Sequence, residues 1–233
     1  MEIINYRPGS DLKPELSIIL SSPNKVHMGN LITQMVKKEK DVIEILYPLE
    51  AVENIPQAYN EMLSQVNSGN VVFIRDGWIP ITVPWVNMII EGLVKDNMVG
   101  VIGTSWISIH APLWNIVLQN KIFGTVMVMP QTKNGKPLLY KYEQAPARVV
   151  CLDGGLIAMS NPFSRRFDET LKYFYDIDLS MRIHLETGKV RVLPILMQSN
   201  ELSLSLDSKV NAALIQFRNK WESKCPYVKL EEV

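Results

Sequence analysis

The chain has 233 residues, 47% of them hydrophobic, which is enough apolar material for one large α/β domain or two small ones. Basic and acidic residues number 24 each, so no overall field attracts nucleic acid or an anionic membrane. Cys151 and Cys225 have no Cys or His at metal-ligand spacing, which argues against a disulfide scaffold or a zinc site. Residues 1–14 lack a signal-peptide core and no window matches a membrane span, so a cytoplasmic location is the default expectation.

The first half of the chain alternates short apolar runs with helix-like spacing. Residues 16–20, 42–47, 71–74 and 98–103 predict strands, and residues 29–38, 55–66 and 84–94 predict the helices between them. The run 71–74 has no polar alternation, which is typical of a central strand covered on both faces. This order predicts an α/β fold with a doubly wound, mostly parallel central sheet flanked by helices.

The second half predicts a small antiparallel element and then further α/β structure. Residues 125–129 and 138–142 are expected to pair across the turn signal Asn134-Gly135. The following predicted elements are a strand, turn and strand over 148–159, a helix over 174–186, a strand over 190–195 and a helix over 207–220. No repeat or linker interrupts the chain. A single domain over 1–233 is expected, with an N-terminal extension at 1–14 and a C-terminal helix and tail at 207–233.

An acidic residue follows the predicted central strand, at the edge where open α/β sheets bind ligands. Asp76 can meet a metal-bound diphosphate, a ribose or a sugar hydroxyl there. It can equally cap the Asp76-Gly77 turn through its carboxylate. Trp78 offers a ring for stacking on a base or sugar, although a tryptophan in such a place is more often packing.

Two aspartates open the predicted helix 174–186. Asp176 is the candidate general base, because a carboxylate within hydrogen-bond reach can deprotonate an attacking sugar hydroxyl. Asp178 is two residues away and points to a different side, so only one of the two faces a given pocket. The structural alternative is that the helix dipole favours aspartates in a first turn.

Asp153-Gly154-Gly155 lies between apolar runs, where the glycines permit close backbone approach and Asp153 can bind an acceptor hydroxyl. A plain hairpin turn is an equally good interpretation. His27, His110 and His184 share no ligand spacing. The chain has no Ser-His-Asp order, phosphate-binding loop or dinucleotide fingerprint, which disfavours hydrolase, kinase and dehydrogenase functions.

Four segments together resemble the family 2-type glycosyltransferases of the nucleotide-diphospho-sugar transferase (GT-A) fold, and most of all the streptomycin-biosynthesis-associated glycosyltransferase-like family. They are residues 17–20, residues 55–60 continuing through 69–76, residues 152–158 with 166–169, and residues 174–180 continuing through 188–189. Their order and spacing carry more of the match than their individual letters.

The resemblance implies a hexosyltransferase-type inverting enzyme that moves a sugar from a nucleotide-diphosphate sugar to a carbohydrate, glycan or lipid-linked acceptor. It places Asp176 as the base. The residues that it places at the donor nucleotide are Ser21, Asn24, Asn60, Arg75 and Asp76, and those at the donor sugar or acceptor are Asp153, Gly154, Trp78 and Asp178. A lipid-linked acceptor would put the protein at the periphery of a membrane.

Two departures from the family pattern concern a metal ion. Relatives end the central strand with paired aspartates, whereas here Gly77 follows Asp76, and the usual late histidine is missing near Gln198-Ser199. A Mn²⁺ or Mg²⁺ ion bound through Asp76 would therefore lose protein ligands.

Two rival functions follow. A catalytically degenerate module would bind nucleotide or carbohydrate without turnover. A nucleotidyltransferase is the weaker rival, because the chain has no Gly-rich, Lys-containing N-terminal loop.

Overall fold

The structure is a computed structural model that describes residues 1–7, 13–108, 121–130, 135–200, 208–222, 224 and 227–229. Within these ranges no helix is long and apolar enough to cross a membrane. Cys151 is a buried free thiol. Three residues named above lie outside the described ranges, namely Cys225, His110 and Asn134, of which Asn134 belongs to the predicted turn.

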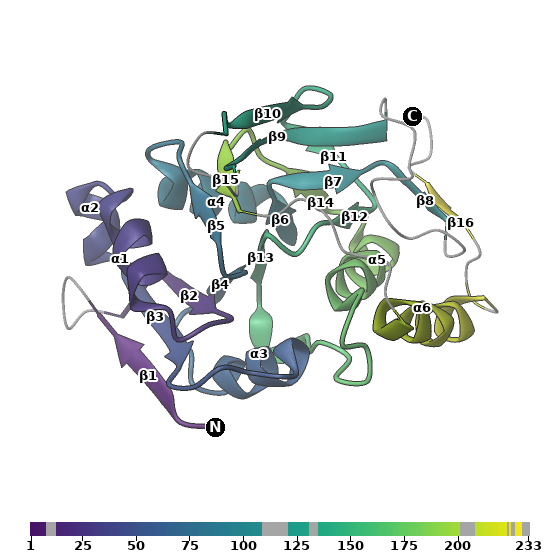
Figure 1. Cartoon of the computed structure of the whole chain (residues 1–233), viewed down its shortest axis with the longest axis horizontal. Helices are drawn as coiled ribbons and strands as arrows, with labels where there is room; N and C mark the ends of the chain where they lie inside the picture. The colour runs from purple at the N-terminus through teal and green to yellow at the C-terminus, as the bar shows by residue number, and fades with distance from the viewer. Residues whose placement is uncertain are drawn as a thin grey trace.

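An eight-stranded sheet runs through the described part of the chain (Figure 1). From edge to edge its strands are β1 (Ile3–Tyr6), β3 (Ile43–Pro48), β2 (Leu16–Leu20), β4 (Asn70–Ile74), β13 (Leu156–Ser160), β6 (Met98–Gly100), β14 (Val190–Val192) and β11 (Ala147–Arg148). β3, β2, β4, β6 and β14 run in one direction, and β1, β13 and β11 run in the other. The carboxyl ends of β2 and β4 therefore meet the start of β13 at one edge of the sheet.

Helices cover both faces of this sheet. One face carries α3 (Ile55–Leu63), α5 (Tyr175–Thr187) and α6 (Ser208–Trp221), and the other carries α1 (Lys25–Thr33) and α4 (Trp85–Lys95), with α2 (Lys37–Asp41) beside α1 (Figure 1). A hydrophobic core lies between the sheet and its helices on each face, and the strands contribute side chains to both. Ile19 and Phe73 pack toward α3, whereas Ile18 and Ile74 pack toward α4. Side chains that alternate along a strand make this possible, and they explain why β2 and β4 are apolar throughout.

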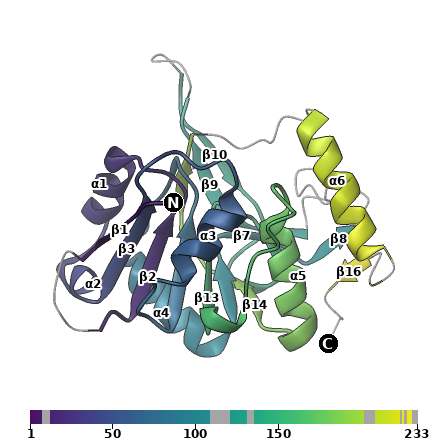
Figure 2. The ribbon, with the colours of Figure 1, turned by 90° about the horizontal axis from the view of Figure 1, so that it is seen from below.

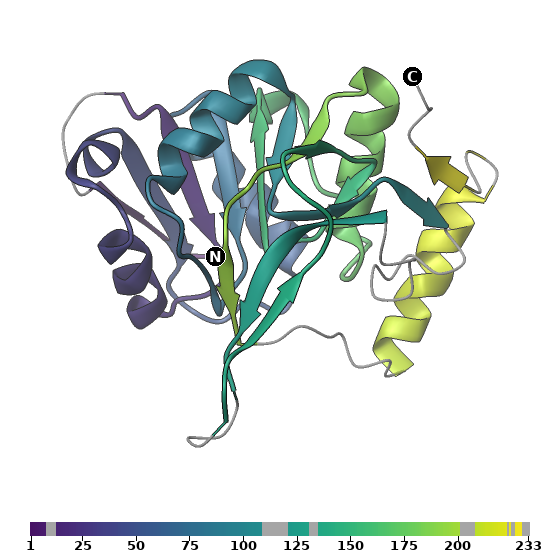
Figure 3. The same cartoon turned by 90° about the horizontal axis from the view of Figure 1, so that it is seen from above.

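A second sheet stands against one end of the first. Its strand order is β12 (Cys151–Leu152), β7 (Ile102–Thr104), β9 (Ile122–Val128), β15 (Met197–Ser199) and β5 (Trp78–Pro80), and β10 (Leu138–Lys141) pairs with β9. Figures 2 and 3 show the β9–β10 hairpin projecting from the body of the protein. The remaining described elements are β8 (Trp106–Ser108), β16 (Tyr227–Lys229), which pairs with it, and a short 3₁₀ turn over Pro162–Ser164.

The predicted order of strands and helices is confirmed for the first half of the chain, with shifts at several boundaries. The first helix begins at Lys25 rather than near residue 29, because the Asn24 side chain accepts hydrogen bonds from the next turn and caps it. The predicted strand 98–103 is divided between β6 and β7, which lie in different sheets. The hairpin interpretation of 148–159 is wrong, because β12 pairs with β7 whereas β13 pairs with β4 and β6.

Candidate active site

The carboxyl ends of β2 and β4 bring three of the predicted donor residues together. The Ser21 hydroxyl accepts a hydrogen bond from the Asp76 backbone N–H at 3.0 Å. The Asn24 side chain, which caps α1, also donates to Asp76 Oδ1 at 3.4 Å. The Asp76 carboxylate is 46% exposed, so it remains open to a ligand from solvent.

His27 reaches the same carboxylate from the first turn of α1, although the sequence predicts no function for it. Its side chain is buried, Nε2 lies 2.8 Å from the Trp78 carbonyl oxygen, and Nδ1 lies 3.3 Å from Asp76 Oδ1. The one signal in the sequence is position, because His27 is three residues beyond the Asn24 cap of a helix that starts at the edge of the sheet.

The register of two short strands explains what stands beside Gly77. β15 runs antiparallel to β5 and sets Ser199 opposite Trp78, so the next residue, Asn200, comes beside Gly77. A Cβ atom on Gly77 would lie 3.4 Å from Asn200 Nδ2, and Gly77 has a φ of +77°. An amide side chain thus lies beside Gly77, one residue beyond the Gln198-Ser199 pair near which the resemblance expects a late histidine.

The polar groups around Asp76 fit a divalent cation only in part. Within the described ranges no three His, Cys, Asp or Glu side chains gather at one point. Asp76 and His27 nevertheless offer a carboxylate and an imidazole nitrogen, and Asn200 adds an amide that can turn its oxygen inward. A diphosphate would supply further oxygen ligands.

Asp176, in the first turn of α5, is held against the loop between the two sheets. Its Oδ2 accepts a hydrogen bond from the Gly154 N–H at 2.6 Å, and a Cβ atom on Gly154 would stand 2.7 Å from that oxygen. Asp153 folds back on the same loop, with its Oδ1 accepting from the Gly155 N–H at 2.8 Å. Glycine at 154 therefore permits the approach of the predicted base.

The surroundings of Asp176 favour its protonated form. Burial, followed by repulsion from Asp153, raises the pKa of Asp176 to about 6, even though Arg75 and two backbone N–H groups act in the opposite direction. Burial also raises the pKa of Tyr59 and of Tyr175 nearby, so both hydroxyls stay neutral. A carboxyl group with a pKa near neutrality is suited to accept a proton and release it again.

Arg75 supplies the positive charge of this cluster. Burial alone would lower its pKa, but Asp153, Tyr175 and Asp176 raise it overall. Its guanidinium carbon lies 5.3 Å from the centre of the Trp78 ring, and among the described residues the group makes no hydrogen bond or ion pair through its side chain. Its donors are therefore available to an anionic ligand.

Trp78 is 2% exposed, which favours the packing interpretation over the stacking one. A Cβ atom on Gly155 would stand 2.3 Å from the indole, so the second glycine of the loop makes room for the ring. Trp78 therefore contributes to the site through Arg75 and through the carbonyl oxygen that contacts His27.

Two predicted site residues have structural roles instead. Asp178 has no exposed surface and accepts contacts from Arg182 at 3.0 Å, Lys220 at 2.7 Å and Trp221 at 3.0 Å, so the prediction that it binds sugar is wrong. Asn60 hydrogen-bonds the backbone of Phe167 through both ends of its amide, at 2.9 Å each, and tethers that loop. Lys220, Trp221 and Phe167 lie far along the chain from these two residues, so the sequence did not predict the contacts.

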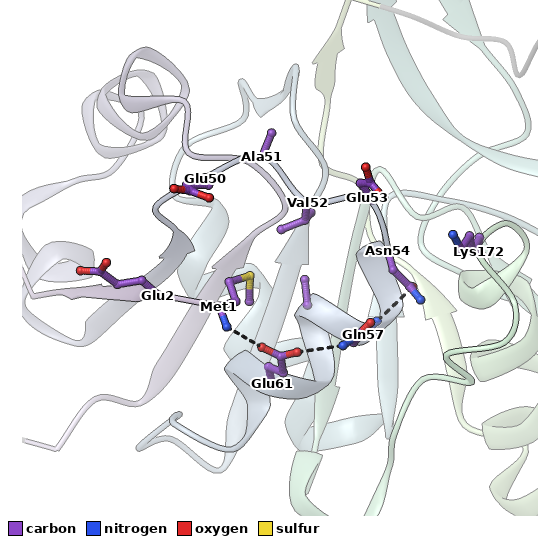
Figure 4. A pocket seen from close by; sticks show the side chains of 11 residues that line it. Met1, Glu2, Glu50, Ala51, Val52, Glu53, Asn54, Gln57, Glu61 and Lys172 are labelled. Carbon is purple, nitrogen blue, oxygen red and sulfur yellow. Dashed lines mark hydrogen bonds and ion pairs between the residues drawn. The ribbon is translucent and has the colours of Figure 1, made fainter.

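A cavity of about 570 Å³ opens beside the loop that follows β3 (Figure 4). Its lining includes Glu50, Glu53, Asn54, Gln57 and Lys172, and none of the predicted site residues. β3 neighbours β2 with its carboxyl end at the same edge of the sheet, so the cavity lies on the edge that carries Ser21 and Asp76. Carboxylates and amides of this kind can hydrogen-bond the hydroxyl groups of a ribose or sugar.

Comparisons with solved structures agree with this architecture. GalNAc-T7 bound to UDP, GalNAc and Mn²⁺ has a TM-score of 0.58 at 13% identity, over 92% of this chain and 49% of that one. S. aureus TarS, residues 1–349, bound to UDP-GlcNAc has a TM-score of 0.51 at 10% identity, over 94% of this chain and 68% of that one. The chain thus spans about half the length of GalNAc-T7. At such identities these similarities establish the GT-A fold alone.

Sequence comparison supplies the family. No curated protein sequence matches the chain. The sequence profile of a family described as "Glycosyltransferase like family" matches residues 25–212, a range that includes both Asp76 and Asp176. The chain therefore belongs to the glycosyltransferase-like family.

Proposed function

We propose that the protein is an inverting glycosyltransferase that moves a sugar from a nucleoside-diphosphate donor to a hydroxyl group of a carbohydrate or related acceptor. The observation that carries this proposal is the Asp176 carboxylate. It lies at the carboxyl edge of a GT-A sheet, fixed by the Gly154 N–H at 2.6 Å, with a pKa raised to about 6 by burial and by Asp153.

In the proposed reaction the acceptor oxygen attacks the anomeric carbon as the bond from that carbon to the diphosphate breaks. Asp176 takes the acceptor proton, and the nucleoside diphosphate leaves with the bonding electrons. Because the attack comes from the face opposite the leaving group, the anomeric configuration inverts. Arg75, whose guanidinium forms no hydrogen bond within the described part of the chain, offers its donors to negative charge beside Asp176.

The donor is proposed to lie along the carboxyl edge of β3, β2 and β4. Ser21, Asn24 and Asp76 meet at that edge, and the cavity beside β3 has a volume suited to a nucleoside-sized group. A divalent cation held by Asp76 and its neighbours would offset the charge of the leaving diphosphate. The solved structures with UDP or UDP-GlcNAc support the choice of a nucleoside-diphosphate donor.

The first test is a thermal-shift screen of nucleoside diphosphates and their sugars, since a ligand that binds only the folded protein raises Tm. Any donor found is then incubated with mixed saccharide acceptors, and NMR of the product reports the anomeric configuration. We expect stabilisation by one nucleoside class and an inverted product. A product that retains the donor configuration would rule out direct displacement with Asp176 as base.

A degenerate binding module is the second candidate, favoured by one observation. Gly77 replaces the second aspartate that the resemblance expects, and the late histidine expected near Gln198-Ser199 is missing. Such a module would bind a nucleoside diphosphate in calorimetry but release none from a donor sugar with any acceptor, with or without Mn²⁺.

A further inference from the structure

The β9–β10 hairpin, which projects from the body of the protein, exposes a run of apolar side chains (Figures 2 and 3). Leu138 is 58% exposed, Leu139 is 62% exposed, and Tyr140 follows them at 39%. Elsewhere in the described part of the chain, exposed large hydrophobic side chains occur singly along the sequence. A continuous apolar run on a projecting segment is typical of a surface that binds a partner.

These apolar side chains lie on both faces of the hairpin. Consecutive residues of a strand point to opposite faces, so Leu138 shares one face with its cross-strand partner Val128, and Leu139 shares the other with Met127. Val128 and Met127 are themselves only partly buried. A protein that packs against one face would leave the other face apolar and in water. A lipid surface that surrounds the hairpin covers both faces.

The outer edge of β10 is poorly suited to accept a further strand. Within the described ranges β10 pairs with β9 alone, which leaves its other edge as a possible template for a second copy of the chain. Lys136 and Pro137 precede β10, however, and Lys141 ends it. Lysine and proline are residues that protect an edge against pairing. The unpaired backbone groups of this edge fit a hydrated headgroup region, and not the hydrocarbon core of a bilayer.

The charge of this region is one-sided, although the chain as a whole is neutral. Residues 97–142 contain four lysines and no aspartate or glutamate. Lys136 and Lys141 are both exposed, and the first acidic residue that follows is Glu143, where the hairpin joins the body. Ammonium groups next to apolar side chains complement the anionic headgroups and the acyl boundary of a phospholipid leaflet.

We propose that the β9–β10 hairpin docks on the headgroup region of an anionic phospholipid bilayer. Leu138 and Leu139 enter the interface from the two faces of the hairpin, and Lys136 and Lys141 contact the lipid phosphates. The local charge provides the attraction that the neutral chain as a whole lacks.

Strand directions place this surface on the side of the carboxylate site. β9 runs parallel to β15 and sets Val128 beside Ser199, which in turn lies opposite Trp78 of β5. The hairpin therefore continues past the point where Asn200 meets Gly77. A bilayer bound there would present a lipid-linked acceptor to this side of the protein. That acceptor class rests on the proposed glycosyltransferase function, whereas bilayer docking does not.

The experiment is flotation of the full chain with vesicles of phosphatidylcholine alone and of phosphatidylcholine mixed with phosphatidylglycerol, at low and high salt. One double variant, Leu138→Ser with Leu139→Ser, removes the apolar contacts. The other, Lys136→Gln with Lys141→Gln, removes the charge. All four side chains are exposed, so both variants are expected to fold, and circular dichroism checks this.

Matched controls remove the same kinds of side chain elsewhere. Val94→Ser with Ile215→Ser removes two comparably exposed apolar side chains on α4 and α6. Lys37→Gln with Lys38→Gln removes two exposed lysines on α2.

The wild-type protein should float with the mixed vesicles, and less so with phosphatidylcholine alone or at high salt. Each lysine near an anionic leaflet contributes about fivefold to binding, so the lysine variant should bind at least about tenfold more weakly. The leucine variant should lose about as much, because burial of apolar surface is removed. Both controls should float like the wild type.

Absence of flotation by the wild type would overturn the docking surface, as would equal flotation of the hairpin variants and their controls. Sedimentation velocity without lipid gives a further check. Self-association that disappears in the leucine variant would assign the hairpin to a contact between copies and also overturn the proposal. Flotation without any nucleoside-diphosphate binding would keep the docking surface and count against the proposed function.

Discussion

Asp176 and Asp178 lie in the first turn of α5, two residues apart, and have opposite surroundings. Asp178 is fully buried and receives donors from Arg182 of α5 and from Lys220 and Trp221, and the latter two fasten α6 to α5. Among the described residues, Asp176 receives hydrogen bonds from backbone N–H groups alone, and burial together with the charge of Asp153 raises its pKa to about 6. A buried acid satisfied by side chains stabilises the fold, whereas one left short of partners is available for chemistry.

The largest effect is expected from Asp176→Asn. Loss of a general base lowers a rate by about 10²–10⁴-fold, so transfer should fall by that factor while donor affinity stays within about twofold. Donor turnover and calorimetric titration of the same preparation measure the two quantities. Equal loss of affinity and turnover would assign Asp176 to binding instead.

Asp178→Ala should lower the stability of the fold rather than the turnover. Removing one partner from a buried ionic cluster costs about 3–5 kcal/mol, and here it leaves Arg182 without its carboxylate and Lys220 with Asp168 alone. Urea unfolding should show this loss, with turnover per folded molecule unchanged. A specific loss of turnover in a stably folded Asp178→Ala protein would contradict the structural role.

Gly154→Ala should shift Asp176 without altering its chemistry. The new Cβ would stand 2.7 Å from Asp176 Oδ2, and displacing a catalytic group by a fraction of an ångström lowers transfer roughly 10- to 100-fold. Gly69→Ala is the control, since nothing lies within 4 Å of its Cβ position. Equal activities of the two variants would mean that the contact with Gly154 does not position the base.

The pH dependence of transfer tests the role of Asp176 and the influence of Asp153 on its pKa. Asp176 must be ionised to accept a proton, so the rate should rise with pH through about 6. Asp153→Asn should move that midpoint to lower pH, because it removes a charge that raises the pKa of Asp176. An unchanged midpoint in Asp153→Asn would assign the titration to another group.

The last prediction concerns stability. The raised pKa of Asp176 means that the folded protein holds this proton more tightly than the unfolded chain, whose pKa is near 3.8. The resulting stabilisation is complete below about pH 4 and disappears as pH rises through about 6. Asp176→Asn should therefore gain about 2–3 kcal/mol on the wild type between pH 4 and pH 7 in paired unfolding curves. A difference that stays flat with pH would show that Asp176 is not perturbed.

The sequence was sufficient for the parts of the fold that depend on local patterns. Uninterrupted apolar runs predicted β2 and β4, and the turn pair Asp76-Gly77 marked the end of β4. The short strands β5 and β15 were not predicted, because three residues carry no periodicity and their pairing joins distant segments.

Site residues were predictable where local geometry decides their role. Gly154 was expected to permit close backbone approach, and the structure shows that what approaches is Asp176. Asp178 was misassigned because it is satisfied by Lys220 and Trp221, more than 40 residues away, and the structural contact of Asn60 was missed because its partner Phe167 is 107 residues distant. His27 was missed since only the fold brings it to Asp76.

The central claim is that Asp176, and not Asp178, carries the chemistry of α5. The most direct test measures nucleoside-diphosphate release and urea unfolding together for the wild type, Asp176→Asn and Asp178→Asn. We predict that Asp176→Asn unfolds like the wild type or later and releases almost no nucleoside diphosphate, whereas Asp178→Asn unfolds earlier and retains turnover per folded molecule. The reverse pattern, with Asp176→Asn active and Asp178→Asn stable but inactive, would contradict the account.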